Sequence, residues 1–205
     1  MKKLLIFIAV MLWTTLSFAQ STTMTSVLGI EFGSKRQQVK EIITSKQPTS
    51  TLYSEKEISM TYENVKWGEY KTMLVIFQFT DDDKLHTVMI FLDPDHCKNV
   101  FYLYDKAVGT INERYYQTTK STEHYSYPYT RSDKYKYTES MVKNDRVTMQ
   151  SLWAFDTRNT PSNDEDDNNI SVMVTDDCVV KVTYQDGVLI DEVIEKQKAK
   201  NSQDY

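Results

Sequence analysis

Hydrophobic residues recur along this chain in patterns typical of strands and helices. Apolar and aromatic residues fill positions 70–80 and 85–92, and the polar run 81–84 separates the two. Runs of strand-forming residues joined by a short polar turn predict a β-hairpin. Both faces of this hairpin are apolar, so we expect both faces to be covered.

The first predicted helix follows a short extended segment. Ser34 begins a capping-box pattern, and Val39, Ile42 and Ile43 continue it at spacings of three and four. This stripe predicts a helix that starts at Ser34 and ends before Pro48.

A second helix is predicted to start at Asp93 and Pro94, as N-cap and first helical residue. Its apolar stripe consists of Val100, Phe101, Tyr104, Val108 and Ile111.

Further strands are predicted at 58–67, 125–130, 134–141, 146–157, 170–175 and 178–184. The string Thr-Asp-Asp occurs at a hairpin turn in each half, at 80–82 and again at 175–177. The fold class predicted is therefore α+β, with two tandem helix-plus-antiparallel-sheet units. The first unit would span 27–92 and the second 93–187, with an insertion. The polar segment 188–205 is either a frayed helix or a disordered tail.

The N-terminus has the pattern of a secretory signal peptide. Lys2 and Lys3 precede an apolar run over 4–16, and Ser17 and Ala19 are the small residues expected before a cleavage site. We therefore expect cleavage after Ala19, a mobile leader over 20–26, and a periplasmic or secreted mature chain. A retained membrane anchor is the alternative, but the apolar run is too short to span a bilayer.

Charge narrows the range of partners. The chain has a formal net charge of −5, and loss of Lys2 and Lys3 would leave the mature chain at −7. An acidic surface disfavours nucleic acid and anionic lipid. We expect no stable membrane insertion after cleavage of the signal peptide.

Cys97 and Cys178 are the only cysteines. An even number in an oxidising compartment permits one disulfide. Such a bond would close a loop of about 80 residues, worth about 4 kcal/mol in the chain-entropy model. Two buried free thiols are the alternative.

Residues 28–34 read Leu-Gly-Ile-Glu-Phe-Gly-Ser and lead into the first predicted helix. This opening, with the hairpin that follows, resembles the superfamily of β-lactamase inhibitory protein and the small outer-membrane-assembly lipoproteins. The resemblance implies a helix packed on an antiparallel sheet, sometimes in tandem, and a binding protein rather than a catalyst. The chain departs from the lipoproteins because it has no cysteine to acylate near the cleavage site.

Two acidic segments suggest metal sites at first inspection. Four possible metal ligands lie within five positions: Asp93, Asp95, His96 and Cys97. Helix capping, however, accounts for the two aspartates. The run 163–169 has consecutive acids and no glycine, unlike a calcium loop, and is expected to be a solvated connection. We predict no metal and no cofactor.

No sequence motif of a catalytic site is recognisable. The three histidines, His86, His96 and His124, lie in no known nucleophile or zinc motif. We predict no catalytic residues and a chain that is not an enzyme.

Tyrosine is the most distinctive residue type, with fourteen copies. Five of them fall on one predicted hairpin: Tyr125, Tyr127, Tyr129, Tyr135 and Tyr137. Such rings form rigid amphipathic contact surfaces, to which Trp153 from the following strand would add. The alternative is that tyrosine is simply a good strand former on a half-buried face.

Arg131, Lys134 and Lys136 would add positive charge beside this aromatic face. The sequence thus predicts a non-enzymatic binding protein for a protein, peptide or glycan of the cell envelope. A structural envelope protein is the first alternative, and a hydrolase with a site assembled only in three dimensions is the second.

Overall fold

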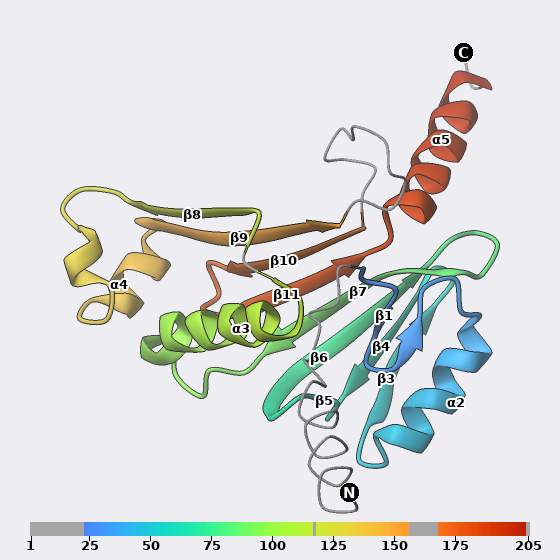
Figure 1. Cartoon of the computed structure of the whole chain (residues 1–205), viewed down its shortest axis with the longest axis horizontal. Coiled ribbons are helices and arrows are strands. Elements are labelled where there is room, and N and C mark those ends of the chain that lie inside the picture. Colours follow the sequence, from blue (N-terminus) through green and yellow to red (C-terminus); the bar gives the residue numbers. More distant parts are fainter. Residues whose placement is uncertain (1–22, 117, 156–167, 204–205) are drawn as a thin grey trace, which may run out of the picture.

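The structure, a computed structural model, describes residues 23–116, 118–155 and 168–203. Within this part the chain folds into helices packed on an antiparallel sheet, so the predicted α+β class is confirmed (Figure 1). The predicted signal peptide, its cleavage site and most of the acidic run 163–169 lie outside the described residues. Within these residues, no helix has the length and apolar character needed to cross a membrane.

The main sheet runs in the order β3-β4-β6-β7-β11-β10-β9-β8, with β5 paired to β6. The strands are β3 (Thr51–Lys56), β4 (Ser59–Glu63), β5 (Lys66–Trp67), β6 (Tyr70–Phe79), β7 (Leu85–Leu92), β8 (Lys120–Tyr125), β9 (Val147–Phe155), β10 (Asn168–Val174) and β11 (Val180–Gln185). A separate ribbon joins β1 (Ser26–Val27) to β2 (Ile30–Glu31). The helices are α2 (Arg36–Lys46), α3 (Val100–Arg114), α4 (Thr138–Lys143) and α5 (Gly187–Gln203), with 3₁₀ turns η1 (Cys97–Asn99) and η2 (Arg131–Asp133).

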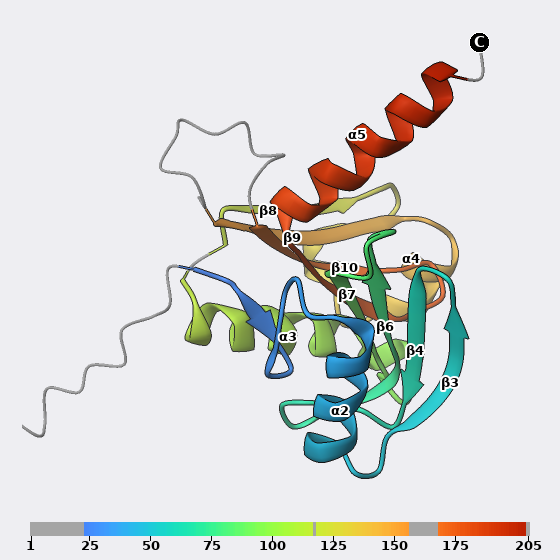
Figure 2. The ribbon, with the colours of Figure 1, turned by 90° about the vertical axis from the view of Figure 1, so that its right-hand side faces the viewer.

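Helices α2 and α3 cover the same face of the sheet (Figures 1 and 2). Arg36 of α2 pairs with Glu55 of β3 at 3.6 Å, and the Tyr104 hydroxyl of α3 lies 2.7 Å from Ser151 Oγ of β9. The strand pairing places Glu55 and Ser151 on one side of the sheet. The core therefore lies between this face and the two helices.

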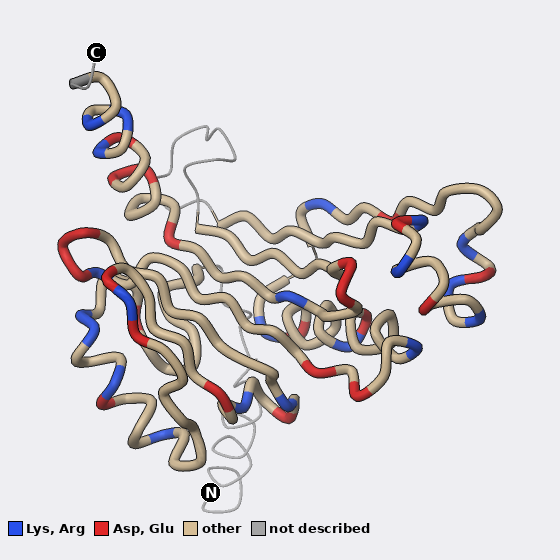
Figure 3. The backbone as a smooth tube through the Cα atoms, turned by 180° about the vertical axis from the view of Figure 1, so that it is seen from behind, with Lys and Arg blue, Asp and Glu red and all other residues tan. Residues whose placement is uncertain are grey.

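The opposite face is only half-buried, contrary to the expectation that both faces of the hairpin are covered. It includes Leu74, Ile76, Met89, Phe91 and Met173, all of intermediate exposure. Seen from behind, no helix of the described chain lies over the middle of this face, and charged residues gather mainly around it (Figure 3). The free edge of the hairpin, along β7, is paired with β11. The sheet is therefore extended sideways, and no second layer of the described residues covers its other face.

The strands of the first hairpin match the prediction closely, but both helix starts differ. The first helix is capped at Lys35, whose backbone N–H donates to Gln38 Oε1 at 2.8 Å. The second helix does not start at Asp93. Asp93 Oδ1 accepts from the Asp95 backbone N–H instead, and Asp95 has a φ of 60°, which a helix excludes. The helical path therefore begins only at η1.

The predicted strands 125–130 and 134–141 are wrong. β8 ends at Tyr125, and Pro128 lacks the N–H that a continuing ladder needs. The Thr130 backbone N–H then donates to Asp133 Oδ2 at 2.9 Å, which caps the turn η2 and leads the chain into α4. The strand β3, between the first helix and β4, was not predicted.

The two ends of the chain are also more ordered than expected. Met24, within the predicted mobile leader, is 1% exposed, and its carbonyl accepts from Asn168 Nδ2 at 2.8 Å. The C-terminal segment forms the helix α5, which projects beyond the sheet (Figure 1). Of the two alternatives for this segment, the helix holds over residues 187–203.

A disulfide joins Cys97 and Cys178, with a Cα–Cα distance of 5.0 Å across 81 residues of sequence. Cys97 follows the end of β7 and Cys178 precedes the start of β11. These two strands pair directly, with Leu92 opposite Val180. The disulfide therefore closes one end of the β7–β11 pairing.

Replacement of both cysteines by serine is expected to lower the free energy of unfolding by about 4 kcal/mol, because the unfolded chain regains the entropy of the closed loop. Urea unfolding of the oxidised wild type and of the double variant measures this difference. An unchanged free energy, or two alkylatable thiols in unreduced protein by intact mass, would contradict the prediction.

Candidate binding surface

The connection between β8 and β9, residues 126–146, forms a lobe at one end of the sheet (Figure 1). We call it the tyrosine lobe. It contains η2 and α4, and α4 packs beside η1. Thr138, Met141 and Val142 of α4 are buried, which anchors the lobe to the core.

Three of the predicted tyrosines are exposed on the lobe. The exposed fraction is 89% for Tyr127, 63% for Tyr135 and 41% for Tyr137. Tyr129 is half-buried, and its hydroxyl lies 2.8 Å from Ser140 Oγ. Its ring packs 5.8 Å from that of Tyr137. The lobe therefore presents aromatic area at defined positions, although it is not the predicted hairpin.

Tyr125, at the end of β8, is half-buried beside Glu123 rather than exposed. Burial, together with the nearby Glu123 carboxylate, raises the pKa of Tyr125 to about 12. Its hydroxyl is therefore neutral at physiological pH, and its ring belongs to the support of the lobe.

Trp153 does not belong to the aromatic surface. It is fully buried, and its Nε1 donates to Asn112 Oδ1 at 3.0 Å and to the Tyr116 carbonyl at 3.1 Å. Its position on β9 faces α3, because alternate residues of a strand point to opposite faces. The prediction that Trp153 joins the tyrosines is therefore wrong.

Lys134 also differs from the prediction, because it is buried and paired instead of free at the surface. Its Nζ lies 2.9 Å from Asp105 Oδ1 and 3.0 Å from Glu123 Oε1. The Tyr135 hydroxyl donates to the other oxygen of Asp105. This network connects the lobe to α3 and β8, and no pattern in the sequence indicates that Asp105 takes part in it.

The other two predicted cations remain at the surface. Arg131 lies 3.2 Å from Glu123, and the ammonium of Lys136 lies 4.9 Å from the centre of the Tyr137 ring. The exposed face of the lobe therefore combines tyrosine rings with positive charge, on a chain whose net charge is negative.

The crowded ligands at 93–97 have other partners. Asp93 Oδ2 pairs with Lys71 at 3.1 Å, and Cys97 is bonded to Cys178. Among the described residues, no three His, Cys, Asp or Glu side chains are grouped closely enough to hold a metal ion. Of the histidines, His96 and His124 are exposed, and burial lowers the pKa of the half-buried His86.

Comparisons of the chain with protein-family models, with curated proteins and with solved structures find no match.

Substitution of Lys134 by Met is expected to destabilise the protein by about 1–3 kcal/mol, because Asp105 and Glu123 lose their shared cation. Lys136→Met is the matched control, since this exposed lysine contacts an aromatic ring and forms no ion pair within the described residues. Urea unfolding at pH 7 compares the two variants. Equal stability of both would show that the network does not support the lobe.

The same network predicts a direction for pH dependence. Burial alone would lower the pKa of Lys134, but its hydrogen bonds to Asp105 and Glu123 raise it overall. The contribution of charged Lys134 to the free energy of unfolding is thus complete below the ordinary lysine pKa. It is lost as the pH rises through the higher pKa that Lys134 has in the folded protein. Above neutral pH, the stability difference between wild type and Lys134→Met should therefore shrink only in strongly alkaline solution.

Proposed function

We propose that this protein is an exported, non-enzymatic binding protein that works in the periplasm or outside the cell. Its partner would be a protein, peptide or glycan, and the tyrosine lobe would make the contact. The observation that best supports this proposal is the exposure of Tyr127, Tyr135 and Tyr137 on the ordered connection between β8 and β9. Tyrosine supplies contact area at low entropic cost, and its hydroxyl gives orientation.

The bracing of the lobe favours recognition over a merely solvated loop. Lys134 ties it to two carboxylates, and the rings of Tyr129 and Tyr137 pack together at a tilt of 46°. A surface that is already ordered loses less conformational entropy when it binds. A structural envelope protein would not need such a lobe, and a hydrolase would need convergent catalytic groups at a pocket.

We also propose that the chain is built from two tandem units. In the first, α2 precedes β3-β4-β6-β7; in the second, α3 precedes β8-β9-β10-β11. The sheet order places the last strands of both units at its centre and their first strands at its edges. The tyrosine lobe would then be an insertion between the first two strands of the second unit.

The two Thr-Asp-Asp turns support this proposed repeat. In each turn the Thr N–H donates to a carbonyl four residues later, at 2.9 Å for both Thr80 and Thr175. The residue three positions after each Thr, Asp83 or Cys178, has a φ near 60° and donates back to the Thr carbonyl. Tandem units of this kind are what the resemblance to β-lactamase inhibitory protein implies, in keeping with a binding role.

The double substitution Tyr127→Ala, Tyr135→Ala is expected to weaken partner binding by roughly 1–3 kcal/mol, because it removes the two most exposed rings of the lobe. The mature chain serves as bait for envelope extracts, and the affinity of the recovered partner is then measured by biolayer interferometry.

Tyr53→Ala, Tyr102→Ala is the control, since these rings are 69% and 58% exposed but lie on β3 and α3. Circular dichroism and urea unfolding establish that both double variants are folded. Unchanged binding by the lobe variant, or an equal loss in the control, would contradict the proposal.

A further inference from the structure

A cavity of about 450 Å³ lies where the C-terminal ends of α2 and α3 meet. The turn between β1 and β2 closes one side, and Trp67 of β5 and Tyr184 of β11 line it from the sheet. Its volume falls within the range of small-molecule sites. It is far from the tyrosine lobe in the fold and plays no part in the proposed partner contact.

Among the described residues that line this cavity are three cations and no carboxylates. Lys46 ends α2, Arg114 ends α3, and Lys66 lies on β5. Within the described part of the chain, none of the three forms an ion pair. A concentration of unpaired positive charge on a chain with net charge −5 favours an anion at this position.

Hydrogen bonds hold the Lys46 ammonium and the Lys66 backbone in place. The Lys46 ammonium donates to the Gly29 carbonyl at 3.2 Å, and a Cβ on Gly29 would lie only 2.1 Å from that nitrogen. The Gln47 side chain exchanges hydrogen bonds of 3.1 and 3.2 Å with the Lys66 backbone. Gly29 has a φ of 74°, a left-handed conformation that favours glycine. The Gln47 contacts fix β5 to the end of α2.

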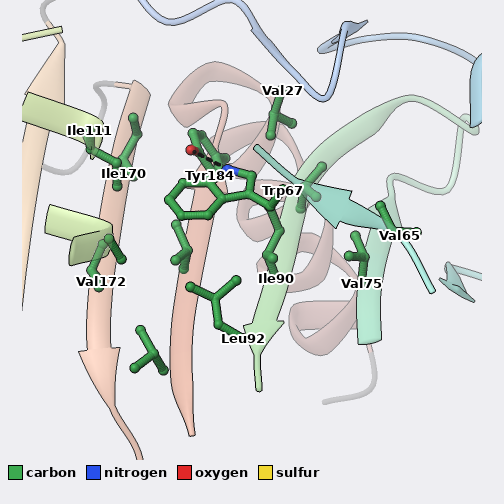
Figure 4. Packing of buried hydrophobic residues seen from close by; sticks show 14 of the residues in the cluster. Val27, Val65, Trp67, Val75, Ile90, Leu92, Ile111, Ile170, Val172 and Tyr184 are labelled. Carbon is green, nitrogen blue, oxygen red and sulfur yellow. Dashed lines mark hydrogen bonds between the residues drawn. The ribbon is translucent and has the colours of Figure 1, made fainter. Parts of the chain in front are cut away.

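The wall of the cavity is aromatic. Trp67 Nε1 donates to the Tyr184 hydroxyl at 3.1 Å, and both rings pack among Val27, Ile90 and Ile111 (Figure 4). Ring faces of this kind accommodate a flat or aliphatic ligand body.

The Tyr115 hydroxyl is a further polar group that a ligand in the cavity can reach. Tyr115 lines the cavity and is only 2% exposed. Among the described residues, no group hydrogen-bonds to its hydroxyl, and no fully buried side-chain nitrogen or oxygen lacks a partner, so this hydroxyl stays accessible at the cavity wall. Burial raises the pKa of Tyr115, so this hydroxyl remains a neutral donor at physiological pH.

Helix dipoles offer a purely structural explanation for part of this charge. Lys46 and Arg114 each stand in the last turn of a helix, where a cation is stabilising without any ligand. A helix dipole does not account for the position of Lys66, because this residue lies on a strand. A helix dipole likewise does not account for the Tyr115 hydroxyl at the cavity wall, so Lys66 and Tyr115 discriminate between the two explanations.

We propose that this cavity binds a small organic anion, with its charged group near Lys46, Lys66 and Arg114 and an aromatic or apolar body against Trp67. The Tyr115 hydroxyl would donate to the ligand. This inference is independent of the tyrosine lobe, because it concerns a different part of the fold and a small molecule in place of a macromolecular partner.

The test uses 8-anilinonaphthalene-1-sulfonate, a fluorescent probe that joins an anion to aromatic rings. Its uncharged counterpart N-phenyl-1-naphthylamine has the same rings without the sulfonate. Titration of the folded, oxidised protein should give saturable binding of one sulfonate probe, and the neutral probe should bind at least about ten-fold more weakly.

Lys66→Gln and Tyr115→Phe should each weaken sulfonate binding by roughly 3–10-fold, while urea unfolding shows each variant to be folded. Lys120→Gln is the matched control, because it removes the same charge from an exposed edge strand and should leave the affinity unchanged.

Equal affinity for the two probes would overturn the proposal. Unchanged sulfonate binding in Lys66→Gln or in Tyr115→Phe would also overturn it. In that case the cations serve the helix ends, and the probe binds elsewhere, for example on the half-buried face of the sheet.

Discussion

The pairing of β7 with β11 is the interaction on which the rest of the structure depends. It joins residues 87–92 to residues 180–185, so the chain must close a long loop before these hydrogen bonds form. Val88, Ile90 and Leu92 stand opposite Tyr184, Val182 and Val180, and all six are buried on the face that carries the helices. The pairing therefore turns two four-stranded meanders into one sheet with one core, and the disulfide fixes the far end of the pairing.

Both proposed sites follow from this central pairing. The cavity lies where the two halves meet, and its lining comes from both: α2 and β5 on one side, α3 and β11 on the other. The tyrosine lobe is the connection between β8 and β9, at the outer edge of the sheet. A hollow at the junction suits a small ligand, and a projecting edge suits a macromolecule.

Local patterns in the sequence predicted the parts of the fold that depend on local interactions. The 85–92 strand, the Thr-Asp-Asp turns and the two helical stripes were predicted because periodicity and turn chemistry act over a few residues. The strands predicted within 126–146 were wrong. Tyrosines are good strand formers, but Pro128 and the cap at Thr130 decide the local structure.

The candidate sites were harder to predict, because their residues come together only in three dimensions. Exposure of Tyr127 and Tyr135 agrees with the predicted surface, but burial of Lys134 depends on Asp105, 29 residues away. The cavity was missed altogether: Lys46, Lys66 and Arg114 share no motif and are unremarkable as separate surface cations. The cysteine pair was found as one of two alternatives, since an even number permits a bond without requiring it.

Native-state hydrogen exchange tests the central role of the β7–β11 pairing most directly. If the two halves form one cooperative unit, amides bonded between β7 and β11 should exchange with the free energy of global unfolding. Amides bonded between β6 and β7 and between β10 and β11 should share that value. Markedly faster exchange between β7 and β11 than within either half would contradict the account, because the halves would then open from each other while each remained folded.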